Sequence, residues 1–159
     1  SPHVISDPAF PNRVAPLLRR HGLAAGQLAL EITEDALLRN LPTAATVARR
    51  LRELGVVMSL DDFGAGYTSL AHLRQIPLDT IKIDRGFAGD VDVNPDTEKF
   101  LRALLALGRD LELRVVVEGV ERQTQVDVLR RIGGTLAQGY LFGRPVPPSD
   151  VELDRVDGR

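Results

Sequence analysis

Five short apolar runs separated by helical patterns constrain the fold of this chain most strongly. The runs show little of the polar alternation of a half-exposed strand, which is typical of parallel strands covered on both faces. They comprise residues 28–32, 56–60, 80–83, 113–117 and 135–142. The helical patterns between them cover residues 42–55, 67–76, 94–111 and 121–134. Repeated strand–helix units predict either a doubly wound sheet or a β/α barrel.

Residues that favour helix ends set the limits of three of these helices. Gly55 is expected just past the C-terminus of the first helix, where a left-handed residue commonly ends a helix. Asn94 is expected to cap the third helix, with Pro95 at its first position. Gly133 and Gly134 are expected to end the fourth helix.

Acidic residues lie in or just after four successive strand runs. Glu31 lies in the first run, Asp61 and Asp62 follow the second, Asp84 follows the third, and Glu118 follows the fourth. A (βα)₈ barrel gathers the carboxyl ends of its strands on one face, where its active site lies. An open sheet would spread the same ends along a line. Four converging acidic ends therefore predict a cation site and favour the barrel.

The adjacent aspartates Asp61 and Asp62 need a specific explanation. Two carboxylates about 4 Å apart repel by about 4 kcal/mol at the effective dielectric of a protein near its surface. Either solvent screens the pair or a cation lies between them. The "FGAG" segment at residues 63–66 lets the backbone approach a ligand closely. Lys82, in an otherwise apolar run, needs a partner if it is buried, and a carboxylate cluster would supply one.

The composition excludes several other classes of protein. A chain of 159 residues with 43% hydrophobic residues can form one domain with a sizeable core. A formal charge of −2 offers no basic surface for DNA or RNA. The absence of cysteine excludes disulfides and thiolate metal sites, and it fits a cytoplasmic location. No apolar run approaches the roughly 18 residues of a membrane span, so no membrane contact is expected.

Carboxylates without cysteine or clustered histidine favour the hard cations Mg²⁺ or Mn²⁺. Two such ions bridged by one aspartate, roughly 3.5–4 Å apart, form the usual arrangement for hydrolysis of a phosphodiester. The residues therefore predict a metal-dependent phosphodiesterase. A single acid at a strand end is more often a helix cap or a solvated loop residue, and only the combination of four strand ends favours the functional interpretation.

Five segments also match the motifs of one family in order and spacing: "LEITED" (30–35), "DDFGAGYTSL" (61–70), "IPLDTIKIDRGF" (76–87), "VVVEGVE" (115–121) and "QGYLFGRPVP" (138–147). Together they closely resemble the EAL-domain family, over nearly the whole chain. The resemblance implies a cyclic di-GMP phosphodiesterase, which opens this bacterial second messenger to pGpG. It also implies a (βα)₈ barrel of the TIM type with one antiparallel strand.

The resemblance implies a metal-binding role for four acids. Glu31 matches a metal ligand, and Asp61 matches the ligand that bridges two metals. Asp62 matches a ligand of the second metal, and Asp84 lies beside that metal. Two Mg²⁺ or Mn²⁺ ions per complete active site are implied, with Ca²⁺ as an inhibitor.

Five other residues match catalytic or positioning groups of the family. Lys82 resembles the lysine that orients the attacking water or the phosphate, and Glu118 the general base or a metal ligand on the water side. Glu121 and Gln138 match groups that position substrate and metal-bound water, and Glu34 the residue that anchors the loop after the two aspartates. Alternatively, Glu34 is a surface acid, Glu121 an acid in a first helical turn, and Gln138 a core amide.

The resemblance covers only the C-terminal portion of the family's domain. Residues 1–147 are expected to supply about five βα units of an incomplete barrel whose N-terminal strands are missing, with residues 148–159 as a tail. No "EAL" tripeptide occurs, so a Glu ligand, an Asn ligand and a substrate-contacting arginine are expected upstream. We therefore expect the fragment alone to be inactive.

The family also implies partners. They are cyclic di-GMP, a second copy of the chain that contacts residues 63–70 and the neighbouring helix, and GGDEF or sensory domains in the same polypeptide. The alternative functions are a receptor that binds cyclic di-GMP without cleaving it and a protein-interaction scaffold.

Overall fold

One parallel sheet organises the fold, which a computed structural model describes for residues 2–64 and 70–150. Its strand order is β1-β2-β3-β4-β5, and every neighbouring pair is parallel. The strands are β1 (Ala29–Thr33), β2 (Val57–Phe63), β3 (Thr80–Ile83), β4 (Arg114–Val117) and β5 (Leu136–Ala137). The prediction of an α/β fold built on parallel strands is confirmed.

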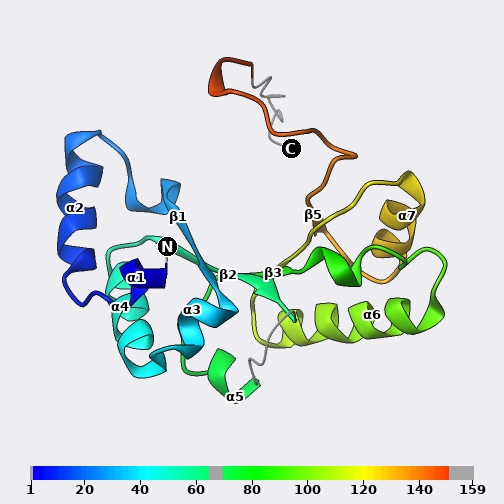
Figure 1. Cartoon of the computed structure of the whole chain (residues 1–159), viewed down its shortest axis with the longest axis horizontal. Coiled ribbons are helices and arrows are strands. Elements are labelled where there is room, and N and C mark those ends of the chain that lie inside the picture. Colours follow the sequence, from blue (N-terminus) through cyan, green and yellow to red (C-terminus); the bar gives the residue numbers. More distant parts are fainter. Residues whose placement is uncertain (1, 65–69, 151–159) are drawn as a thin grey trace.

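Seven helices accompany the sheet in the described part of the chain. They are α1 (Pro2–Ile5), α2 (Phe10–Arg20), α3 (Glu34–Leu38), α4 (Leu41–Glu53), α5 (Leu70–Leu73), α6 (Pro95–Asp110) and α7 (Gln123–Arg131), with short 3₁₀ segments at Ala25–Gln27, Arg85–Phe87 and Pro148–Asp150. In Figure 1, α2 and α4 lie to the left of the strands, α3, α5 and α6 below them, and α7 to the right. Among residues 2–64 and 70–150, no helix has the length and apolar character needed to span a bilayer.

Most predicted elements are present, with one clear error. Asn94 caps α6 through hydrogen bonds to the Asp96 and Thr97 amides, and Pro95 begins the helix, as predicted. The predicted helix over 67–76 is the short α5, and residues 65–69 lie outside the described part. The strand predicted over 135–142 is wrong beyond Ala137.

The chain leaves the sheet after Ala137 because Gly139 packs directly on the backbone that follows β4. A Cβ at Gly139 would lie 2.1 Å from the Val120 carbonyl oxygen. The Leu141 amide donates to that carbonyl at 3.1 Å, and the Phe142 amide turns back to the Gly139 carbonyl. These two hydrogen bonds take the place of the strand pairing that would have extended β5.

The two faces of the sheet differ in chemistry. Met58, Leu60, Ile81 and Ile83 are fully buried and belong to the hydrophobic core. Side chains alternate between faces along a strand, so the intervening positions point to the opposite face. These positions carry polar groups on the first three strands, and the same face continues just beyond β4: Glu31, Ser59, Asp61, Thr80, Lys82 and Glu118. The helices thus cover an apolar face, and the opposite face concentrates charge.

Four helices end with a left-handed residue. The residues are Gly22, Gly55, Glu112 and Gly133, with φ of 64°, 91°, 57° and 93°. Each time, the next amide donates to the carbonyl five residues earlier, as Leu113 does to Gly108 at 2.8 Å. This pattern is the Schellman motif, which satisfies carbonyls at the helix end. The predicted cap at Gly55 is confirmed, and Glu112 occupies a position that glycine fills in the other three.

We expect Glu112→Gly to raise the free energy of unfolding by about 1 kcal/mol. A left-handed backbone costs a residue with a Cβ roughly 1–2 kcal/mol, and the greater flexibility of unfolded glycine offsets part of the gain. Urea denaturation of the purified protein measures the change.

The matched control is Gly22→Ala. An added Cβ there has no atom within 4 Å, so only the backbone conformation opposes the substitution. It should lower stability by about 1 kcal/mol. Equal stability of Glu112→Gly and the wild type would show that the Glu112 backbone is not strained.

Candidate metal centre

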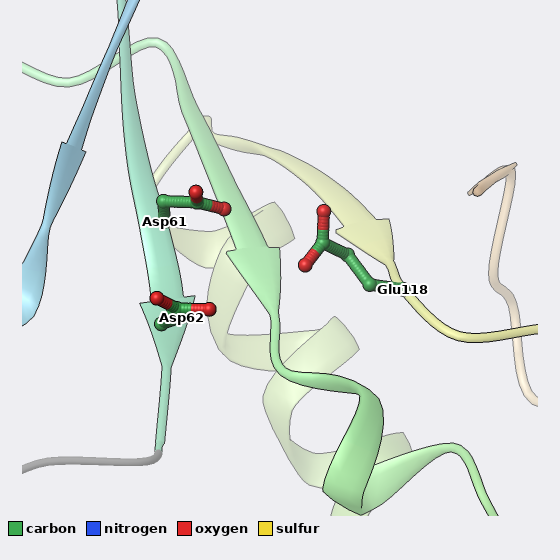
Figure 2. Close-up of side chains that lie close together, drawn as sticks. All are labelled: Asp61, Asp62 and Glu118. Carbon is green, nitrogen blue, oxygen red and sulfur yellow. The ribbon is translucent and has the colours of Figure 1, made fainter. Parts of the chain in front are cut away.

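A β-bulge places Asp61 and Asp62 on the same side of the sheet. Leu60 pairs with Ile81 and Phe63 with Ile83, so β2 contains one residue more than β3 between these pairs. Asp62 adopts a left-handed conformation with φ of 57°. In a regular strand the two neighbouring carboxylates would point to opposite faces. The extra residue removes this alternation: in Figure 2 the Asp61 side chain points toward β3, and the Asp62 carboxylate lies in front of the end of β2.

Lys82 joins carboxylates from three other segments. Its Nζ lies 3.1 Å from Glu31 Oε1, 3.1 Å from Asp61 Oδ1 and 2.7 Å from Glu118 Oε1. The lysine side chain is only 11% exposed, so its charge must be compensated within the protein. The sequence-based expectation that carboxylates would surround this lysine is confirmed.

The three acids hold Lys82 in its charged form. Burial alone would lower the pKa of the ammonium, but the interactions with Glu118, Glu31 and Asp61 outweigh it and raise the pKa above its ordinary value. The lysine is therefore a permanent cation at any physiological pH. It compensates part of the negative charge at the carboxyl ends of β1, β2 and β4.

Three carboxylates converge closely enough to bind one metal ion. Asp61, Asp62 and Glu118 each offer an oxygen within 4.8 Å of the others. Figure 2 shows Glu118 at the end of β4, pointing back toward the two aspartates. Asp61 Oδ1 is buried and lies 3.1 Å from the Lys82 ammonium. A donor set of three carboxylates, all oxygen, fits a hard divalent cation.

Negative charge accumulates around Asp62. Burial, Asp61 and Asp84, in that order, raise the pKa of the Asp62 carboxyl above its ordinary value, and Lys82 opposes them. The ionised form of Asp62 is thus disfavoured in the metal-free protein. A bound cation would reverse this effect, because it favours the charged form.

Asp84 and Glu34 flank this cluster in different ways. Asp84 precedes the 3₁₀ segment Arg85–Phe87, and its Oδ1 accepts from the Gly86 amide at 2.8 Å. Glu34 is the first residue of α3 and is only 4% exposed. The surface position considered for Glu34 is therefore wrong. Both acids are close enough to raise the pKa of Asp62.

Glu121 and Gln138 lie beside the cluster. Together with Glu118, they line a hollow of about 200 Å³ between the ends of β4 and β5. The Gln138 backbone joins the two segments, because its amide donates to Val117 and its carbonyl accepts from Val120. The structure thus brings both predicted residues to the edge of the carboxylate site.

The sequence reasoning missed other residues of this region. Arg85 and Tyr140 line the same hollow, and the Arg144 guanidinium lies 4.5 Å from the centre of the Tyr140 ring. Their only signal in the sequence is adjacency, since Arg85 follows Asp84 and Tyr140 lies two residues after Gln138. Gln125 was also missed, and it has no signal beyond its place in a helical pattern.

The comparisons with known proteins agree on one family. The sequence model of the EAL domain matches residues 1–145. The cyclic di-GMP phosphodiesterase NbdA of Pseudomonas aeruginosa is 47% identical over 135 residues, which cover 85% of this chain and 17% of NbdA. MucR of the same species, a bifunctional diguanylate cyclase/cyclic di-GMP phosphodiesterase, is 42% identical over 134 residues, or 84% of this chain and 20% of MucR. The chain thus spans about a fifth of these relatives.

Solved structures extend the agreement to the fold. A MucR phosphodiesterase in complex with c-di-GMP superposes with a TM-score of 0.86 at 38% identity, covering 94% of this chain and 60% of that one. BlrP1 of Klebsiella pneumoniae, in a manganese and cyclic di-GMP complex, superposes with a TM-score of 0.83 at 30% identity. The match covers 89% of this chain and 36% of the BlrP1 chain. The family match spans more than nine-tenths of the chain, and the protein therefore belongs to the EAL domain family.

Proposed function

We propose that this chain forms part of a metal-dependent phosphodiesterase domain that hydrolyses cyclic di-GMP to pGpG. One observation carries the proposal: Asp61, Asp62 and Glu118 converge within metal-binding distance beside the buried Lys82. The names of NbdA and MucR support the choice of substrate. The c-di-GMP complex of the MucR structure supports it further.

The carboxylates of the polar sheet face would hold the metal. We assign Asp61, Asp62 and Glu118 to one Mg²⁺ or Mn²⁺ ion, with Asp84 beside it. Asp61 would bridge this ion to a second one, to which Glu31 would also bind. Such ions, when bound, lower the pKa of a coordinated water and stabilise charge on a phosphate. Ca²⁺, with its longer and more flexible coordination, is proposed to occupy the site without supporting turnover.

The protein groups have separable roles in this proposal. Lys82 keeps Glu31, Asp61 and Glu118 at fixed positions, and its ammonium presents positive charge to an anionic phosphate. Glu118, held by Lys82, can accept the proton of the attacking water through its carboxylate. Glu121 and Gln138 would contact the substrate from the adjoining hollow, and Glu34 would anchor the segment after Asp62.

Further partners belong to the same proposal. MucR combines diguanylate cyclase and phosphodiesterase functions, which supports fusion of this domain to a GGDEF or sensory domain. We propose a homodimer in which residues 63–70 and the neighbouring helix meet a second copy. Residues 65–69 of that surface lie outside the described part of the chain. An intracellular second messenger as substrate would place the domain in the cytoplasm.

Asp61→Asn and Glu118→Ala should each lower cyclic di-GMP hydrolysis by the full-length protein by roughly 100-fold or more. Each substitution removes a charged oxygen ligand from a site that has three within reach of one ion. Chromatography of pGpG formed with Mg²⁺ or Mn²⁺ measures the rate. Asp110→Asn, at the exposed end of α6, is the matched control and should retain the wild-type rate.

Calorimetry with Ca²⁺ in place of Mg²⁺ separates the alternatives. A receptor would bind cyclic di-GMP saturably and release no pGpG with any metal, whereas a scaffold would bind no nucleotide. Wild-type turnover by both Asp61→Asn and Glu118→Ala would contradict the assigned metal site.

Lys82→Met should destabilise the metal-free protein, because three carboxylates lose their common cation. Loss of one partner of a fully buried ion pair lowers stability by about 3–5 kcal/mol. Because these acids are partly exposed, the loss of stability should be about 3 kcal/mol or less. Mn²⁺ should stabilise this variant more than it stabilises the wild type, because removal of the ammonium leaves uncompensated carboxylates that attract a cation. Thermal denaturation with and without Mn²⁺ tests both points.

Lys99, the other lysine of the sequence, supplies the control. Its side chain is 76% exposed, so Lys99→Met should change stability by less than about 0.5 kcal/mol. If the two substitutions have equal effects, Lys82 does not organise the carboxylates.

Asp62→Asn should stabilise the metal-free protein at neutral pH. The pKa of folded Asp62 is raised, so its ionised form disfavours the folded state, and this penalty disappears as pH falls through the folded pKa. The gain should stay below about 1 kcal/mol because solvent screens the exposed side chain. Denaturation at neutral and acidic pH should therefore show a difference only at neutral pH, and a gain that grows on acidification would contradict the charge explanation.

A further inference from the structure

The side chain of Gln125 connects two loops of the metal-bearing face. It is only 1% exposed, although it lies in the first turn of α7, a helix whose Gln123 faces solvent. Gln125 Oε1 accepts hydrogen bonds from the Glu121 and Arg122 amides, both at 2.8 Å. Its Nε2 donates to the Ala88 carbonyl at 2.8 Å and to the Gly89 carbonyl at 3.3 Å. A single amide thus satisfies four backbone groups.

The two connected loops adjoin acids of the site. Residues 118–122 follow β4 and include Glu118 and Glu121, and residues 85–89 directly follow Asp84. The Glu118 amide donates to the Ile83 carbonyl at 3.0 Å, so the first of these loops starts from a fixed point on β3. Gln125 fixes its other end.

Close packing between the loops leaves little freedom in their separation. Gly119, with φ of 73°, packs against Arg85, and a Cβ there would lie 2.4 Å from the Arg85 Cβ. On the outer side, Arg122 makes two hydrogen bonds to the Asp92 carboxylate and a third to the Gly89 carbonyl. Water can replace the partners of the partly exposed Arg122 guanidinium, whereas the side-chain amide of Gln125 is buried and depends on its protein partners.

We propose that Gln125 is a positioning residue that sets the distance between the loop after β3 and the loop after β4, and through it the place of Glu118 in the metal centre. Its amide is suited to this task because it donates to one loop and accepts from the other. Glutamate has the same shape, but its carboxylate can only accept. The assignment deepens the proposed phosphodiesterase function and rests on it only for the metal that Glu118 would bind.

Gln125→Glu tests the proposal with minimal change in volume. The variant keeps the acceptor for Glu121 and Arg122 and places negative charge against the carbonyls of Ala88 and Gly89. In the full-length protein without metal, amide hydrogen exchange of residues 85–89 and 118–122 should become at least about tenfold faster, while α6 stays unchanged. The dissociation constant of Mn²⁺, measured by electron paramagnetic resonance, should rise about 10- to 100-fold, as for other residues that orient metal ligands.

Gln123→Glu is the matched control, because it makes the same chemical change at the exposed first residue of α7. It should leave loop exchange, Mn²⁺ affinity and turnover at wild-type values. If Gln125→Glu does not fold, Gln125→Met, which lacks both polar groups at similar length, provides the same comparison.

A double variant distinguishes positioning from general destabilisation. If Gln125 acts through Glu118, adding Gln125→Glu to Glu118→Gln should weaken Mn²⁺ binding no further. The proposal is overturned if Gln125→Glu lowers only the melting temperature, or if it weakens Mn²⁺ binding equally in both backgrounds. A wild-type protein that binds Mn²⁺ but cleaves no cyclic di-GMP would refute the phosphodiesterase assignment and leave this result standing.

Discussion

The candidate site depends on the ion pairs between the Lys82 ammonium and the carboxylates around it. This ammonium is the buried positive charge among carboxylates that come from β1, β2 and the end of β4. Without it, these three segments would present like charges to one another at a partly buried surface. With it, the fold tolerates a negative centre, in which burial and then the neighbouring Asp61 and Asp84 still raise the pKa of Asp62. Lys82 and a bound metal ion would thus both neutralise these carboxylates.

The sequence was sufficient for the parts of the fold that depend on local patterns. Apolar runs predicted four strands to within about three residues at each end, and Asn94 and Pro95 predicted the start of α6. The helix α2 was not predicted, because Pro11 and Pro16 lie within its span and Pro16 stands in its interior, where proline is unfavourable. The end of β5 was also misplaced, since it depends on a contact between Gly139 and Val120 that no local pattern encodes.

The sequence predicted which residues form the candidate site more fully than it predicted how they are arranged. Acids at successive strand ends indicated convergence, and Lys82 indicated their partner. The bulge that aligns Asp61 with Asp62 arises from pairing with β3, so it cannot be recognised in the sequence of β2 alone. Gln125 resembles an ordinary surface residue of an amphipathic helix, and only its hydrogen bonds to two loops distinguish it from Gln123.

The bulge in β2 makes the geometry of the candidate metal centre separable from the fold. One extra residue relative to β3 aligns the two aspartates, while the pairs on either side, Leu60 with Ile81 and Phe63 with Ile83, already fit a regular ladder. Deletion of one of the two aspartate codons would restore an uninterrupted ladder and leave a single carboxylate opposite Lys82. One genetic step would therefore alter the candidate metal centre and leave the core pairs on either side of it in place.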